Sequence, residues 1–252
     1  MDLNELQQYF IDRVEATSGK HVILQADPKL PSHAMIRVAK DDQPAHILLY
    51  RPEFESVLPY LIAFQCEFAL RTILSENQFQ LKAKSNLDSE FLRLMTDHLK
   101  TDKTVPKGAI PQLAKQFSTG IGHQLRSMPI SLRIDKLLSS KYSGLIRLQH
   151  QSIEQQLQDN VHCLGPHARA VAPEQIIRPN AMMNAAFAKF FSELWFVPPV
   201  FTPYVAAGYE DDAKKLLEIL DEIPSEPEHD REVVDAWAKY TKLDKWYYTE
   251  TR

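Results

Sequence analysis

Residues 58–74 constrain the fold more than any other part of this chain. Their only clearly polar members are Gln65, Glu67, Arg71 and Thr72, so a helix formed here is apolar around most of its circumference. A helix of this kind is buried on nearly all sides. The sequence therefore predicts a central helix around which the N-terminal half of the protein is built.

Three short stretches before this helix have the composition of β-strands. They cover residues 21–26, 34–39 and 45–50 and are separated by prolines and by a polar turn at residues 41–44. We predict a small sheet whose last two strands form a hairpin. Apolar residues at helical spacing before the sheet, ending at Gly19, predict an N-terminal helix.

After Pro52 the pattern becomes helical and, apart from loops, stays so to the end of the chain. Prolines stand where one periodic segment stops and the next begins. The predicted helices lie near residues 55–75, 88–100, 110–127, 130–142, 144–160, 173–195, 209–222 and 230–242.

The scarcity of glycine and the absence of two glycine-rich motifs argue against a dinucleotide-binding protein and against a P-loop nucleotide-binding protein. The chain has 7 glycines and 16 prolines, and it contains neither a G-x-G-x-x-G nor a G-x-x-x-x-G-K-[ST] motif. Its 2 cysteines are too few for a disulfide scaffold, and its first residues are polar where a secretory signal is basic and then apolar. We expect a reduced, cytoplasmic protein without a membrane span.

The central helix carries a specific resemblance. Residues 60–71 read YLIAFQCEFALR, which resembles the Y-L-I-A-H-E-x-x-H-x-x-R helix of ImmA/IrrE-type peptidases, zincin-like metalloenzymes. In this register the two zinc-binding histidines fall on Phe64 and Phe68, and the general-base glutamate falls on Gln65. A phenyl ring has no lone pair for zinc, and an amide is not a useful base at neutral pH. The alternative is that these residues are core aromatics without peptidase ancestry.

A later segment extends the resemblance. Residues 124–135 resemble a downstream part of some ImmA/IrrE-like proteins, in which a glutamate completes the zinc site, and Asp135 would hold that position. An ion pair with Arg133 or Lys136 is the simpler interpretation of Asp135. The residue patterns predict an α+β, predominantly helical protein with an all-helical half over residues 144–252, and the resemblance implies a zincin-like domain over residues 1–143.

The middle of the chain is basic, although the whole chain has a net charge of −4. Residues 79–148 contain 12 basic and 5 acidic groups, whereas residues 149–252 contain 10 and 17. This supports a second hypothesis, an anion-binding or nucleic-acid-binding protein. Its candidate residues are Lys82, Lys84, Arg93, Arg126, Arg133 and Lys136. The alternative is that the basic segment packs beside the acidic one.

Two further segments allow more than one interpretation. His162, Cys163 and His167 could ligate a metal with one more donor, such as Cys66 or His150, but a single cluster of this kind is weak evidence. The apolar run over residues 194–204 is either a strap over the core or an exposed surface for a partner. The aromatic residues near the C-terminus suggest an end docked onto the body of the protein.

The first functional hypothesis is a catalytically inactive, metallopeptidase-like protein that binds another protein or regulates it. It predicts no cofactor, no bound metal and no catalytic residue, and the vestigial positions are Phe64, Gln65, Phe68 and Asp135. The second hypothesis is the nucleic-acid or anion binder. The third is an enzyme whose site gathers residues distant in sequence, for example Gln65, Asp135 and a histidine. The sequence does not determine the oligomeric state.

Overall fold

The computed structural model describes residues 2–74, 78–100 and 105–251. The chain divides into two compact units, the first made of residues 1–78 and 130–156 and the second of residues 79–129 and 157–252. These units do not coincide with the predicted segments 1–143 and 144–252, because helix α4 (Ile110–Lys141) runs through both. The predominantly helical α+β fold that the sequence predicts is confirmed.

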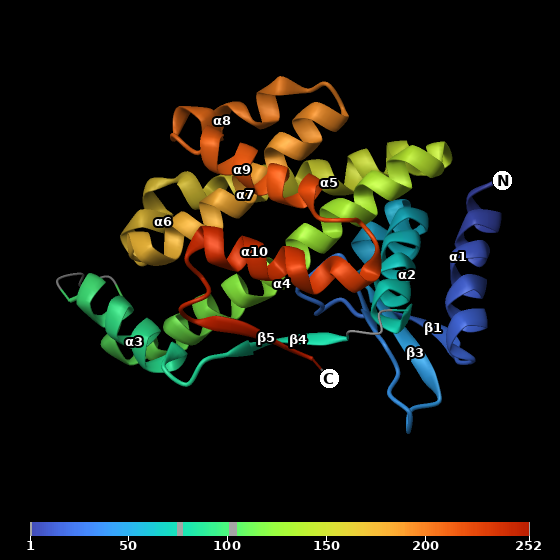
Figure 1. Ribbon diagram of the computed structural model, residues 1–252, viewed down its shortest axis with the longest axis horizontal. Helices are drawn as coiled ribbons and strands as arrows, with labels where there is room; N and C mark the ends of the chain where they lie inside the picture. The colour runs from blue at the N-terminus through green and yellow to red at the C-terminus, as the bar shows by residue number, and fades with distance from the viewer. Residues whose placement is uncertain (1, 75–77, 101–104, 252) are drawn as a thin grey trace. The chain divides into compact units, whose positions relative to one another are not determined.

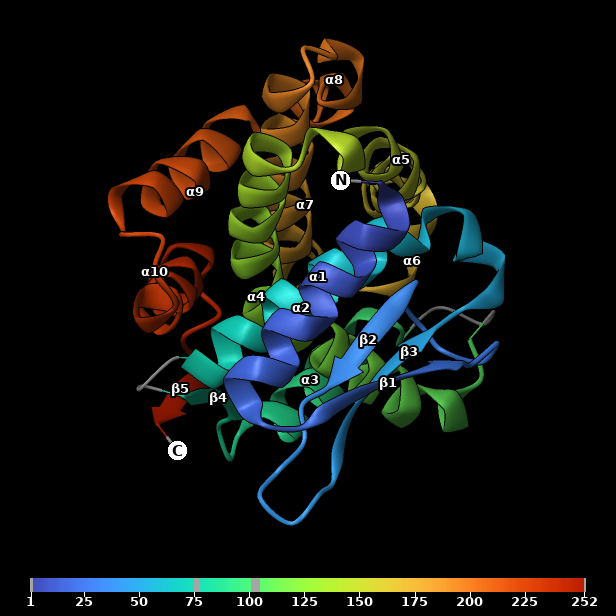
Figure 2. The same ribbon diagram turned by 90° about the vertical axis from the view of Figure 1, so that its right-hand side faces the viewer.

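The first unit is a small sheet with helices packed against it. Its elements are α1 (Leu3–Ser18), β1 (His21–Ala26), β2 (Ala34–Arg37), β3 (Ala45–Tyr50), the 3-10 segment η1 (Pro52–Val57), α2 (Leu58–Leu74), the end of α4, η3 (Ser143–Leu145) and most of α5 (Ile146–Val161). The strand order is β1-β3-β2, with β1 parallel and β2 antiparallel to β3, so the predicted hairpin is confirmed. Helices α1 and α2 lie side by side against the sheet (Figures 1 and 2).

Helix α1 ends at Gly19, as the sequence predicts. Asp2 forms a capping box with Glu5, which satisfies free backbone N–H groups of the first turn. Gly19 ends the helix with a φ of 70°, a conformation that glycine adopts without steric cost. The helix buries Leu6, Phe10 and Val14.

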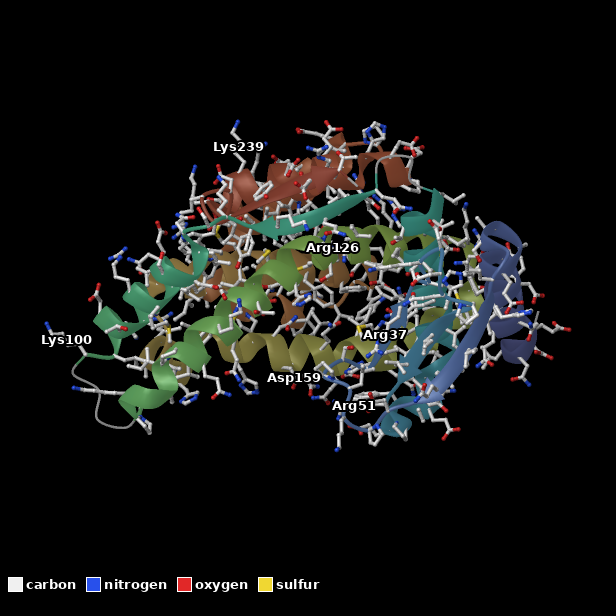
Figure 3. The ribbon with its side chains drawn as sticks, turned by 90° about the horizontal axis from the view of Figure 1, so that it is seen from below. Arg37, Arg51, Lys100, Arg126, Asp159 and Lys239 are labelled. Atoms are coloured by element: carbon white, nitrogen blue, oxygen red, sulfur yellow. The ribbon has the colours of Figure 1, made fainter. Side chains whose placement is uncertain are left out.

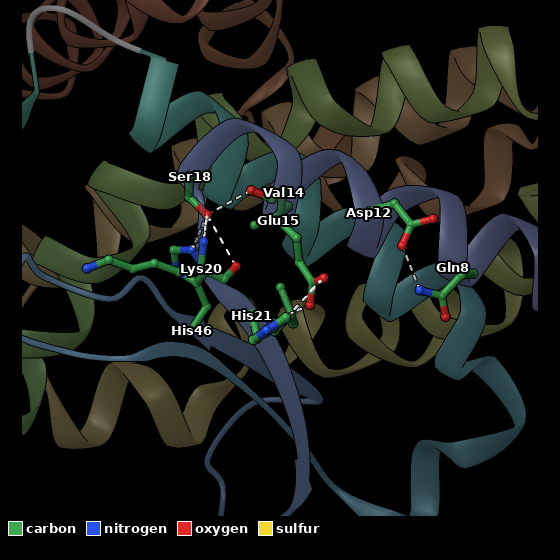
Figure 4. Close-up of polar contacts among 9 residues, drawn as sticks. Gln8, Asp12, Val14, Glu15, Ser18, Lys20, His21 and His46 are labelled. Atoms are coloured by element: carbon green, nitrogen blue, oxygen red, sulfur yellow. Dashed lines mark hydrogen bonds and ion pairs between the residues drawn. The ribbon is translucent and has the colours of Figure 1, made fainter.

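A polar cluster joins the end of α1 to the sheet (Figure 4). The imidazole of His46 is buried; its Nδ1 accepts from the Ala39 N–H at 2.9 Å, and its Nε2 lies 2.9 Å from the Ser18 hydroxyl. The Ser18 hydroxyl donates to the Val14 carbonyl at 2.8 Å, so it receives the Nε2 proton of a neutral histidine. Burial, helped by Lys20, lowers the pKa of His46, which agrees with a neutral ring.

The second unit contains most of the remaining helices and a two-stranded ribbon. Its elements are β4 (Phe79–Ala83), α3 (Leu87–His98), η2 (Lys107–Ala109), the first part of α4, η4 (His162–Leu164), α6 (Pro166–Val171), α7 (Glu174–Leu194), η5 (Pro198–Val200), α8 (Thr202–Ala206), α9 (Glu210–Glu222), η6 (Pro227–His229), α10 (Asp230–Thr241) and β5 (Tyr247–Thr251). Strands β4 and β5 pair antiparallel (Figure 1). Trp237 and Trp246 are fully buried, so the predicted docking of the C-terminus is confirmed, although Tyr248 is exposed.

Two secondary-structure predictions were wrong, and two short helices were missed. The chain is not helical from Pro52 to its end, because β4 and β5 interrupt it. The predicted break between residues 127 and 130 is absent: α4 continues through Pro129, with Leu125 and Ile130 buried on either side. Burial of apolar side chains outweighs the roughly 3 kcal/mol that an internal proline costs a helix. The short helices α6 and α8 were not predicted.

The apolar run over residues 194–204 is neither a simple strap nor a simple exposed surface. It forms the turn η5 and the start of α8, which bury Phe201 and Tyr204. Phe196 is 89% exposed and has a φ of 58°, unusual for a bulky residue.

Residues 52–74, which form η1 and α2, are the one described helical segment long and apolar enough to cross a membrane. Half of its most apolar stretch is buried within the fold. Helix α2 is accordingly a core helix of the first unit, as the sequence predicts.

Two glycines on α4 provide a matched test of packing against the ribbon. A Cβ at Gly122 would lie 2.9 Å from the Tyr247 ring, which is buried and whose hydroxyl donates to the Ser118 carbonyl. Gly122→Ala should therefore cost about 1–3 kcal/mol. At Gly120 a Cβ meets no atom within 4 Å, so Gly120→Ala should add about 0.5–1 kcal/mol of stability. Urea unfolding measures both, and equal shifts would contradict the close packing of α4 on Tyr247.

Candidate functional site

The residues that the resemblance identifies lie on α2, on the core helix of the first unit. Phe64 and Phe68 are half-buried and four residues apart, so they share one face of the helix. The ring of Tyr60, one turn earlier, lies 6.0 Å from that of Phe64. This face therefore presents aromatic carbon where a zinc site needs ring nitrogens.

The side-chain amide of Gln65 is hydrogen-bonded to the free edge of strand β2. Its Nε2 donates to the Ala34 carbonyl at 3.1 Å, and its Oε1 accepts from the Ile36 N–H at 3.0 Å. Strand β2 lies at the edge of the sheet, so within the described residues these backbone groups have no neighbouring strand on that side. The amide takes the place of a peptide group in a strand ladder and fastens α2 to β2.

Asp135, from the end of α4, lies against the same face of α2. Its carboxylate accepts from the Tyr60 hydroxyl and from the Gln149 side-chain amide, each at 2.8 Å. Gln149 in turn accepts from the Ser139 hydroxyl at 2.6 Å. Burial raises the pKa of the Asp135 carboxyl from 3.8 to about 7, and the two hydrogen bonds oppose this rise.

These residues do not fit zinc. Position 65 offers an amide, positions 64 and 68 offer phenyl rings, and Asp135 is held by Tyr60 and Gln149. Within the described ranges, no group of three or more His, Cys, Asp and Glu side chains could hold a metal ion. The predicted convergence of Gln65 and Asp135 with a histidine is not supported either: Gln65 is engaged by β2 and Asp135 is fully buried.

Two further residues of α2, Cys66 and Glu67, follow Gln65 in the sequence and are buried. Glu67 is buried and forms an ion pair with Arg13 of α1. This pair links the two helices. Burial raises the pKa of the Cys66 thiol to about 12, so at neutral pH this cysteine is protonated and a poor nucleophile.

The predicted loop ligands take other roles. Cys163 is half-buried and its sulfur accepts from the Asn184 amide at 3.4 Å, while His162 and His167 are exposed. Burial raises the pKa of the Cys163 thiol, which opposes the thiolate form that metals bind.

The basic residues of the second hypothesis fall into both units. Lys82, Lys84, Arg93 and Arg126 belong to the second unit, whereas Arg133 and Lys136 belong to the first. Arg133 is buried. Lys82 pairs with Glu250 at 3.8 Å, and Arg93 pairs with Asp97 at 3.5 Å. Burial thus withdraws Arg133 from solvent and local ion pairs engage Lys82 and Arg93, while the anion-binding hypothesis itself stays a prediction.

The second unit contains a groove that the sequence analysis missed. This β4–α4 groove has a volume of about 410 Å³ and lies between strand β4 (Gln80, Leu81 and Ala83) and one face of α4. That face contributes Lys115, Ser118, Thr119, Gly122, His123 and Arg126, and Leu87 of α3 and Tyr247 of β5 complete the lining. From the sequence, Lys115 and Arg126 were seen only as members of the basic segment over residues 79–148. The groove was missed because β4, which forms its other wall, was not predicted.

Charged side chains stand at the ends of the β4–α4 groove. Lys115 pairs with Asp88 at 3.3 Å, and the Arg126 guanidinium lies 5.9 Å from the centre of the Phe79 ring. Figure 3 shows Arg126 on α4 beside β4, and Lys239 pointing outward from α10. The groove therefore combines an apolar floor with basic groups on one wall.

No family model, curated protein or solved structure matches this chain. The ImmA/IrrE-type resemblance of α2 thus stays a prediction.

The role of Gln65 can be tested with a carboxylate. Gln65→Glu places a charged acceptor against the Ala34 carbonyl and removes the donor, so it should cost about 1–3 kcal/mol at pH 7. The unfavourable contact raises the folded-state pKa of the new carboxyl, and its protonated form again offers one donor and one acceptor. The loss should therefore shrink when urea unfolding is repeated near pH 4.

Gln65→Met is the control for this experiment. It removes both hydrogen bonds without adding a titrating group, so its cost relative to wild type should not change with pH. Equal stability of Gln65→Glu and wild type at pH 7 would contradict the proposed role of the amide.

Asp135 should leave a pH signature on stability. Because its folded-state pKa is raised, the unfolded chain releases this proton first as the pH rises from about 4 to about 7. The free energy of unfolding of wild type should therefore fall, relative to that of Asp135→Asn, as the pH rises through this window. The fall is about 1.4 kcal/mol for each pKa unit between the folded and the unfolded state. The asparagine keeps an acceptor for Tyr60 and Gln149. A stability difference that is constant from pH 4 to pH 8 in urea unfolding would refute the raised pKa.

Proposed function

We propose that this protein is a non-catalytic module of metallopeptidase-like ancestry that binds another protein. The observation that carries the proposal is the bonding of Gln65: the side chain at the general-base position is an amide, and both its polar atoms are held by strand β2. An amide so held neither accepts a proton from water nor turns toward a substrate.

The surroundings of Gln65 support the same conclusion. Phe64 and Phe68 supply no zinc ligand, and the carboxyl of Asp135 is buried and bonded to Tyr60 and Gln149. A chain that keeps a core helix and its polar contacts but lacks the reacting groups has a scaffold for binding. Regulation of the bound partner is part of this proposal.

A cytoplasmic location also belongs to the proposal. Cys66 and Cys163 are both free thiols, as expected where thiols are kept reduced.

Metal content and peptidase activity test the proposal together. The purified full chain, incubated with zinc and then dialysed, should retain far less than one zinc per chain and should not cleave labelled casein. Casein cleavage that needs zinc and is blocked by a chelator would overturn the proposal. Stoichiometric zinc that survives His162→Ala/His167→Ala would also overturn it, because that metal would lie outside the loop.

A further inference from the structure

We propose that the β4–α4 groove binds an extended acidic segment of the partner protein, which adds as a strand to the free edge of β4. This rests on the proposed function, that the chain acts by binding a protein. The proposal names the site and the chemistry of the ligand, and three features of the second unit support it: a free strand edge, an apolar floor and a basic wall.

The strand edge supplies main-chain hydrogen bonds. The Lys84 N–H donates to the Trp246 carbonyl at 2.8 Å. This bond shows which backbone groups along residues 79–84 face β5. Because bonding alternates along an antiparallel pair, the backbone groups of Phe79, Leu81 and Ala83 face the other edge. Among the described residues no strand pairs with β4 on that side. Leu81 and Ala83, two of the residues with this free edge, also line the groove.

The floor accommodates small apolar side chains. Leu81, Ala83 and Tyr247 border it, and Gly122 brings the backbone of α4 close to the Tyr247 ring. The volume of about 410 Å³ suits a few side chains of a single extended strand. Strand addition places alternate side chains of the ligand on this floor and directs the others away from it.

The α4 wall gives the groove its charge preference. Lys115, His123 and Arg126 are spaced by eight and three residues, which puts them on one face of the helix. Lys115 and Arg126 carry permanent positive charge; Lys115 is paired with Asp88, and the lining residues themselves include no carboxylate. A ligand with acidic side chains therefore complements this wall.

The same features favour a polypeptide over a nucleic acid. Tyr247, the aromatic residue of the groove, is only 5% exposed and offers no face for base stacking. An extended peptide can instead place its acidic residues selectively and bond to the edge of β4.

Fluorescence anisotropy with labelled peptides tests the charge preference. The full chain should bind a peptide of alternating glutamate and valine at least about tenfold more tightly than one of alternating lysine and valine. Arg126→Glu should weaken binding of the acidic peptide by about tenfold or more, and Arg126→Gln by less. Lys239→Glu makes the same charge change on α10, away from the groove, and should leave affinity within about twofold. Equal losses in Arg126→Glu and Lys239→Glu would overturn the site.

Strand addition itself is tested with the peptide backbone. The acidic peptide methylated at the amide nitrogens of alternate residues cannot donate to β4, and one of its two methylation registers should bind at least about tenfold more weakly. Full affinity of both registers would overturn strand addition. Tighter binding of oligodeoxythymidine than of the acidic peptide, lost in Arg126→Glu, would assign the groove to nucleic acid instead. These results are independent of the zinc and casein assays, so the two proposals fail separately.

Discussion

The hydrogen bonds between Gln65 and strand β2 are the interaction on which the first unit depends. A buried helix must satisfy any polar group on its surface, and an edge strand must have its free N–H and C=O groups covered. One amide meets both requirements, because it supplies a donor for Ala34 and an acceptor for Ile36. It is therefore a contact between helix and sheet at the position that the proposed register assigns to the general base of a metallopeptidase.

The polar groups around α2 follow the same pattern. Glu67 is paired with Arg13, and Asp135 with Tyr60 and Gln149, so each buried carboxyl has partners within the first unit. Such contacts orient α1, α2 and the end of α4, since an unpartnered carboxyl would cost far more than an apolar side chain. Polar side chains thus stabilise the core of the first unit, whereas in the second unit polar side chains line an open groove.

Local patterns predicted the first unit well. The bounds of α1, β1 and β3 agree with the sequence because capping residues, β-branched runs and turns define them locally. The ribbon was missed because β4 and β5 are short and are paired across more than half of the chain. The sequence predicted a break in α4 at Pro129, because local propensity disfavours proline inside a helix. Burial in the tertiary structure stabilises the continuous helix instead.

The candidate sites show the same limit. Phe64, Gln65 and Phe68 were selected from the pattern of one helix, and their assignment to a former zinc site stays a prediction. The hydrogen bonds of Gln65 to β2 and the partners of Asp135 could not be predicted, because they join residues separated by many positions and by several elements. The lining of the β4–α4 groove comes from four elements, β4, α3, α4 and β5, and the sequence revealed only the positive charge of α4.

Hydrogen exchange at Ile36 tests the central claim most directly, that the amide at position 65 is a structural group fastened to the sheet. The account predicts that the Ile36 amide proton exchanges slowly although β2 is an edge strand, and that Gln65→Met makes it exchange at least about tenfold faster. Fast exchange of this proton in the wild-type protein would contradict the account, because the Gln65 side chain would then be free for another role.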